Sequence, residues 1–175
     1  LLQIVEDDEK SLKNCFKNLQ DVNLIITTGG VSVGKKDLVK KCLEDLGMHT
    51  KFWRVNVKPG KPLLYGLFKN IPTFGLPGNA VSSYVCFVLF VIEAIKKMNC
   101  TSDQIIKKKS AILTENISNE SNRETYYRGV FFIKTNKKYV RVLSNQDSSL
   151  MKNLSTANCL IKIDRKENIC KNNIV

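Results

Sequence analysis

The sequence predicts an α/β layered domain followed by a small all-β domain. In the first hundred residues, short β-rich apolar runs alternate with stretches whose apolar residues recur at helical spacing. Beyond residue 104 the helical spacing gives way to short alternating runs separated by polar turns. We therefore predict domains over residues 1–100 and 104–175, with a hinge at residues 99–103.

Residues 1–5 resemble the end of a strand, and a helix is predicted over residues 8–19, which Asp7 or Asp8 can cap. Residues 22–27 form a continuous apolar run, typical of a strand buried on both faces of a parallel sheet. The later elements, in chain order, are a helix over 37–46 that ends at Gly47, strands over 52–57, 63–68 and 72–76, and a long helix from Asn79 to about Met98. His49 is placed in the loop after the second helix.

The second domain is predicted to be a sandwich or an open barrel. Its strands are expected over residues 109–114, 126–134, 139–143 and 159–163. Polar turns such as residues 119–122, 135–137 and 145–147 separate them.

Composition narrows the possible functions. The net charge of +12 favours an anionic partner, but lysine is frequent throughout and the longest basic block has three residues, so we predict no nucleic-acid binding. The six cysteines form no CxxC pair, and we predict reduced thiols and a cytoplasmic protein. The longest apolar run, residues 84–92, is far shorter than the roughly 20 residues that span a bilayer. With one histidine, His49, any catalysis must use carboxylates, lysines and a metal.

Three loop motifs within about fifty residues carry the functional signal. The first runs from Gly29-Gly30 through Ser32 and Gly34 to Asp37, between a predicted strand and a predicted helix. Glycines let backbone N–H groups approach a ligand, and a helix N-terminus adds partial positive charge. Asp37 can serve either as a helix cap or as a ligand of Mg²⁺ beside a phosphate, and the residues alone leave both roles open.

The second and third motifs complete an anion-binding set. In Lys58-Pro59-Gly60-Lys61-Pro62 the prolines stiffen a corner, so that its two lysines can converge on one anion. A solvated basic turn is the alternative. Pro77-Gly78-Asn79 forms a strand-to-helix turn whose N–H groups can hold a phosphate, although an ordinary capped helix start would use Asn79 too.

In their order and spacing these motifs resemble the molybdopterin molybdenumtransferase family, known as MoeA in bacteria and as the E-domain of gephyrin-type proteins. Tyr127-Arg128-Gly129, the turn at residues 146–149 and Ala157-Asn158-Cys159-Leu160 are similar to its C-terminal part. The resemblance implies a three-layer, MoaB/Mog-like molybdopterin-binding domain, N-terminally incomplete, followed by the family's small β-domain. The matching region corresponds to about the C-terminal two-fifths of a family member's sequence.

The resemblance implies that the protein transfers molybdenum from molybdate to adenylylated molybdopterin, with Mg²⁺, and releases AMP. Asp37 would hold the metal, and Lys58 and Lys61 would bind molybdate or phosphate. Gly29, Gly30, Ser32, Gly34, Pro77, Gly78 and Asn79 would cradle the phosphoryl groups, and Ser148 would approach them from the β-domain. The family also implies a homodimer formed through absent N-terminal domains, so we expect this chain alone to bind without turnover.

Two other functions, both found in related proteins, are alternatives to the molybdenumtransferase. A Mog-type molybdopterin adenylyltransferase has a related fold, but it predicts a Gly-Gly-Thr-Gly-like first loop and no trailing β-domain. A nonenzymatic scaffold, as in gephyrin, is the second alternative. The presence of Asp37, Lys58 and Lys61 favours the transferase.

Overall fold

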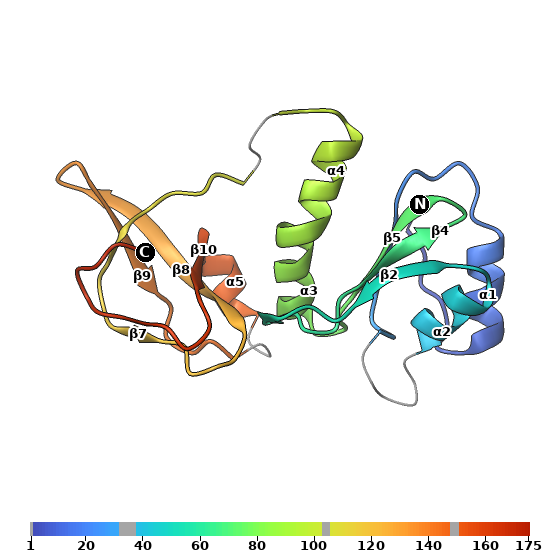
Figure 1. Cartoon of the computed structure of the whole chain (residues 1–175), viewed down its shortest axis with the longest axis horizontal. Helices are drawn as coiled ribbons and strands as arrows, with labels where there is room; N and C mark the ends of the chain where they lie inside the picture. The colour runs from blue at the N-terminus through green and yellow to red at the C-terminus, as the bar shows by residue number, and fades with distance from the viewer. Residues whose placement is uncertain (1, 32–37, 103–105, 148–150) are drawn as a thin grey trace. The chain divides into compact units, whose positions relative to one another are not determined.

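The computed structural model describes residues 2–31, 38–102, 106–147 and 151–175 (Figure 1). The chain divides into two compact units. The first unit comprises Leu1–Val55 and Gly60–Phe87, and the second comprises Asn56–Pro59 and Val88–Val175. A mixed α/β sheet in the first unit and β-sheets in the second confirm the predicted fold class. The predicted domain boundary at residues 100–104 stays a prediction. In the structure the boundary between the two units falls between Phe87 and Val88, inside the long helix.

The first unit is built on a four-stranded sheet with the order β1-β5-β4-β2. The strands are β1 (Ile25–Thr28), β2 (His49–Trp53), β4 (Leu64–Phe68) and β5 (Ile71–Leu76). Only β1 and β5 are parallel; β5, β4 and β2 pair antiparallel. The prediction of a first strand buried on both faces is wrong, because Ile26 is 39% exposed. The strand also begins three residues later than predicted, after Asp21 adopts a positive φ of 53°.

Helices α1 (Glu9–Lys17) and α2 (Leu38–Asp45) pack against one face of this sheet (Figure 1). Their apolar residues meet those of the sheet in one core, formed by Leu12, Phe16, Val39, Cys42, Leu43, Ile25, Leu64 and Phe68. Asp8 caps α1, as predicted: its Oδ1 accepts hydrogen bonds from the backbone N–H groups of Lys10 and Ser11, both at 2.9 Å. Hydrogen bonds from Ser11 hold the pKa of Asp8 below its ordinary value. Such a cap stabilises a helix by about 1 kcal/mol.

The long helix predicted after Asn79 is confirmed, with an interruption that the sequence did not indicate. It consists of α3 (Ala80–Cys86), a π-helical segment η1 (Phe87–Val91) and α4 (Ile92–Met98). Asn79 caps α3 by accepting a hydrogen bond from the N–H of Ser82 at 3.1 Å. No helix in the described ranges is long and apolar enough to cross a membrane.

The predicted strand over residues 52–57 is wrong. Strand β2 begins at His49, which was placed in a loop, and ends at Trp53. Arg54 then adopts a φ of +77°, which no regular strand residue has. Val57–Lys58 forms the separate strand β3, which pairs in parallel with β8 of the second unit.

The second unit contains a sheet with the order β10-β8-β9-β6, and β3 joins it at β8. Its strands are β6 (Ile112–Leu113), β8 (Glu124–Lys134), β9 (Lys137–Val142) and β10 (Cys159–Ile163), which confirms the four predicted strands with shifted ends. The sequence did not predict the two-residue strands β7 (Ile117–Ser118) and β11 (Asn168–Ile169), which pair with each other, or the helix α5 (Lys152–Thr156). The core consists of Ala111, Leu113, Ile117, Val140, Ile161 and Ile163.

Asn119 binds two segments of the second unit, residues 121–125 and residues 163–164. Its side chain is buried, with 2% of the residue exposed. The amide nitrogen donates to the carbonyl oxygens of Arg123 at 2.9 Å, Ile163 at 3.3 Å and Asp164 at 2.8 Å. The amide oxygen accepts from the N–H of Ser121 at 3.1 Å and from the hydroxyl of Thr125 at 2.9 Å.

The turn between β8 and β9 yields a stability prediction. Its two central residues, Thr135 and Asn136, have φ values of 49° and 58°, as in a type I′ hairpin. A β-branched residue is unfavourable in this left-handed region, whereas asparagine is tolerated there. We expect Thr135→Asn to raise the free energy of unfolding by about 0.5–1 kcal/mol in urea denaturation. The reciprocal control, Asn136→Thr, should lower it; a gain in both variants would contradict this explanation.

Candidate functional site

Four segments of the first unit leave its sheet at the same end. Strands β1 and β5 are parallel, so the Gly29-Gly30 turn and the Pro77-Gly78-Asn79 turn both follow carboxyl ends there. Strand β4 runs the opposite way, which places Lys61, three residues before its start, at that end. Trp53, the last residue of β2, pairs with Leu64, the first residue of β4. The topology therefore gathers two glycine-containing turns and a lysine, as the motifs predict.

The Gly29-Gly30 turn is held by main-chain hydrogen bonds on both sides. The N–H of Gly29 donates to the carbonyl of Leu76 at 3.0 Å, and the carbonyl of Gly30 accepts from the N–H of Val39 at 3.1 Å. Both glycines have positive φ, 88° and 66°. The turn is therefore fixed between the end of β5 and the start of α2.

The two turns lie side by side. A methyl group added to Gly78 would be 3.4 Å from the Cα of Gly29, which is ordinary van der Waals contact. Gly78 and Asn79 are exposed, whereas Pro77 is buried. The helical start after Asn79 points its first N–H groups toward this end of the sheet, where partial positive charge favours an anion.

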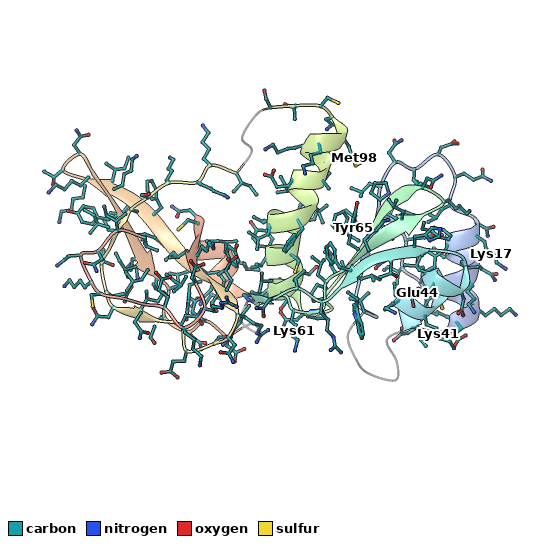
Figure 2. The ribbon with its side chains drawn as sticks, viewed as in Figure 1. Lys17, Lys41, Glu44, Lys61, Tyr65 and Met98 are labelled. Atoms are coloured by element: carbon teal, nitrogen blue, oxygen red, sulfur yellow. The ribbon has the colours of Figure 1, made fainter. Side chains whose placement is uncertain are left out.

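Lys61 is exposed, and main-chain hydrogen bonds fix its position (Figure 2). Its carbonyl accepts from the N–H of Val55 at 2.9 Å and from that of Leu63 at 3.0 Å. The preceding carbonyl, of Gly60, accepts from the thiol of Cys86 at 3.3 Å. Burial raises the pKa of Cys86 to about 12, so at neutral pH the thiol keeps the proton that it donates.

Trp53, which the motifs did not assign to the site, lies at this end of the sheet together with Arg54. The guanidinium carbon of Arg54 is 4.3 Å from the centroid of the Trp53 ring, within the range of a cation–π contact. The indole N–H donates to the carbonyl of Val31 at 2.9 Å. The sequence signal for this contact is a basic residue directly after a tryptophan, just before the Lys58–Lys61 corner.

The other predicted site residues are not brought together by the described structure. Lys58 lies on β3, in the second unit. Ser32, Gly34, Asp37 and Ser148 lie outside the described residues. Within the described ranges no three histidine, cysteine or acidic side chains could hold a metal ion. The six cysteines form no disulfide in the structure.

In the second unit, Gln146 and Asp147, the first two residues of the predicted turn, are hydrogen-bonded to β8. The side-chain amide of Gln146 accepts from the N–H of Arg128 at 2.8 Å and donates to its carbonyl at 3.0 Å. The guanidinium of Arg128 donates to the carbonyl of Asp147 at 3.1 Å, while its Nε has no partner among the described residues. Arg128 is 1% exposed, and burial lowers its pKa. A buried cation thus lies directly beneath the start of this turn.

Two family models match the sequence. Residues 1–97 match the family described as the probable molybdopterin binding domain. Residues 110–173 match the MoeA C-terminal region (domain IV). The first match alone covers more than half of the chain, and it includes all three loop motifs.

Individual relatives agree with both matches. The chain is 34% identical over 170 residues to a molybdopterin molybdenumtransferase of Haemophilus influenzae, covering 94% of this chain and 41% of the relative. It is 34% identical over 158 residues to the molybdenum cofactor synthesis protein cinnamon of Drosophila melanogaster, covering 89% and 26%. The crystal structure of a molybdopterin biosynthesis MoeA protein from Pyrococcus horikoshii has a TM-score of 0.77 at 24% identity, covering 98% of this chain and 41% of that one. The chain therefore spans less than half the length of these relatives.

Proposed function

Since the chain belongs to the MoeA family of molybdopterin-binding proteins, we propose that it is part of an enzyme of molybdenum cofactor biosynthesis. The proposed reaction transfers molybdenum from molybdate to adenylylated molybdopterin and releases AMP. The observation that carries the proposal is the gathering of the Gly29-Gly30 turn, the Pro77–Asn79 turn and Lys61 at one end of the sheet. Loops at the carboxyl ends of strands are where α/β domains bind phosphorylated ligands.

The chemistry of this end of the sheet suits attack at phosphorus. Backbone N–H groups and cationic side chains stabilise the negative charge that develops when an adenylate is cleaved. Lys61 supplies one charge, and Arg54 supplies a second with the planar donor geometry that matches phosphate oxygens. His49, the only histidine of the sequence, lies at the opposite end of the sheet, where it pairs with Leu67. We therefore assign no proton transfer to it.

The remaining parts of the proposal follow from the family. Molybdate and adenylylated molybdopterin are the proposed substrates, and Lys58 and Ser148 stay proposed binding residues. Mg²⁺ with Asp37 as its ligand is also a proposal, and no step is derived through the metal. A homodimer and a cytoplasmic location are proposed on the same ground.

The two alternative functions receive less support. A Mog-type adenylyltransferase predicts no trailing β-domain, whereas residues 110–173 match the MoeA C-terminal region. A gephyrin-like scaffold needs no phosphate-binding residues, so the phosphate-binding assay below separates it from the transferase.

Lys61→Ala tests the site. We expect it to weaken the binding of inorganic pyrophosphate to the 175-residue chain by roughly tenfold or more, because a hydrogen bond to a charged group contributes about 1.5–3 kcal/mol. Isothermal titration calorimetry measures the affinity. The free energy of unfolding should change by less than about 0.5 kcal/mol, because the lysine is exposed.

Lys17→Ala is the matched control. Lys17 is also exposed, and its carbonyl accepts from the ammonium of Lys69, in the β4–β5 turn at the other end of the sheet (Figure 2). Its removal should leave the affinity unchanged within about twofold, because exposed charges at this distance are largely screened. Equal losses in both variants would indicate a nonspecific charge effect and would remove Lys61 from the site.

A further inference from the structure

Trp53 makes three contacts that meet at the proposed site. Its indole N–H donates to the carbonyl of Val31 at 2.9 Å. The guanidinium carbon of Arg54 lies 4.3 Å from the ring centroid, and the ammonium of Lys40 lies 5.2 Å from it. Trp53 is the only tryptophan of the sequence, and it is half-buried at the end of β2.

The hydrogen bond from Trp53 to Val31 connects the glycine turn to β2, in addition to its hydrogen bonds to β5 and α2. Three successive residues, Gly29, Gly30 and Val31, each bond to a different element: β5, α2 and β2. Val31 is 1% exposed and packs so closely on β5 that a methyl group on Gly75 would lie 2.5 Å from its Cγ1. The attachment by Trp53 is the only one of the three hydrogen bonds that a side chain supplies. A substitution can therefore remove it without altering the turn's own residues.

The contact with Arg54 depends on an unusual backbone. Arg54 has a φ of +77°, a conformation that costs a non-glycine residue about 1–2 kcal/mol. Its N–H donates to the carbonyl of Leu63 at 2.8 Å, which fixes that conformation. No carboxylate forms an ion pair with Arg54 within the described part of the chain. The ring of Trp53 restricts where the guanidinium lies.

We propose that Trp53 is a positioning residue that holds the Gly29–Val31 turn and the guanidinium of Arg54 in the arrangement that binds a phosphate group. The proposal rests on the proposed function, because it acts through the same anion site. The indole edge holds the turn through the carbonyl of Val31, and the indole face orients Arg54. Binding then requires less ordering of either group, which increases affinity.

Two substitutions of Trp53 separate the contribution of the indole N–H from that of the aromatic face. Trp53→Phe keeps an aromatic face for Arg54 but lacks the N–H donor. It should weaken pyrophosphate binding by roughly fivefold, the equivalent of one hydrogen bond. Trp53→Leu removes both contacts and should weaken binding by roughly 20-fold or more, since a cation–π contact of this kind adds a further factor of a few. Both are measured by calorimetry on the 175-residue chain.

Phe52→Leu is the matched control. Phe52 precedes Trp53 on β2, is 37% exposed and packs on Tyr65 with ring centroids 5.4 Å apart. Within the described residues it forms no hydrogen bond or ring contact with the glycine turn or with Arg54. Loss of this aromatic side chain should lower the thermal midpoint in the same way as Trp53→Leu, with pyrophosphate affinity unchanged.

A double-mutant cycle distinguishes positioning from a loss of stability. Arg54→Gln should weaken binding clearly in the wild type and much less in the Trp53→Leu background, because an unrestrained guanidinium contributes little. Additive effects, together with wild-type affinity in Trp53→Phe, would overturn the role of Trp53 and leave the anion site intact. If the wild-type chain bound no pyrophosphate, the anion site itself would be wrong.

Discussion

Asn119→Ala is expected to lower the free energy of unfolding of the second unit by about 3–5 kcal/mol. In a buried position the side chain has five hydrogen-bond partners, at residues 121–125 and 163–164, and its two amide hydrogens are shared among three carbonyls. Alanine removes the bond to the carbonyl of Ile163 and the bond to the N–H of Ser121, whereas the carbonyls of Arg123 and Asp164 also accept from Thr125 and Glu167. Each buried group that is left unsatisfied costs about 1–3 kcal/mol. Rearrangement and entry of water reduce that sum, which gives the stated range.

The experiment can assign the loss to one unit. Trp53 lies in the first unit, so tryptophan fluorescence in urea follows that unit, whereas far-UV circular dichroism follows both. Asn119→Ala should shift part of the dichroism transition to lower urea and leave the fluorescence transition in place. Asn116→Ala is the matched control, because exposed Asn116 accepts a single recorded hydrogen bond, from the N–H of Lys171 at 2.7 Å. A loss below about 1 kcal/mol in Asn119→Ala, equal to that of the control, would contradict the central role of this side chain.

Gly30→Ala is expected to destabilise the first unit by about 2–4 kcal/mol and to abolish measurable pyrophosphate binding. The φ of +66° is unfavourable for alanine, and the new methyl group would lie 2.6 Å from Cγ2 of Val39. Relief of that contact must move either α2 or the turn, and both form the site. Fluorescence of Trp53 in urea measures the stability, and calorimetry measures the binding.

Gly29→Ala separates the two causes. Gly29 has a φ of +88°, but a methyl group there meets no atom within 4 Å. It should therefore cost about 1–2 kcal/mol, from backbone conformation alone. If the two variants lost equal stability, the contact with Val39 would have no energetic consequence.

Elements whose determinants lie close together in the sequence were predictable. Helix α1 has apolar residues at helical spacing and a local cap in Asp8, and both features are present within a dozen residues. The hairpin of β4 and β5 is similarly local, with the two-residue turn Lys69-Asn70. The order of the three loop motifs also indicated the family before any structural comparison.

Features that depend on distant partners were not predictable. Residues 119–122 read as a polar turn, yet Asn119 is buried, because its partners include carbonyls of residues 163 and 164. Residues 52–57 have the composition of one strand, but Arg54 interrupts it and β3 pairs instead with β8. The glycine turns of the site were predicted from local sequence. The contribution of Trp53 was not, because the carbonyl that it contacts lies 22 positions earlier in the chain.

The pairing of β3 with β8 determines when each lysine of the Lys58–Lys61 corner can fold during synthesis. Val57 and Lys58 leave the ribosome well before their partners, Glu124 and Thr125. At about 5–20 residues per second, several seconds pass in which this segment has no strand to pair with. Lys61 can reach its final backbone conformation within the first unit, through bonds to Val55 and Leu63. Lys58 reaches its final backbone conformation only after β8 has been synthesised. The backbone of Lys61 is therefore fixed early in synthesis, and that of Lys58 is fixed late.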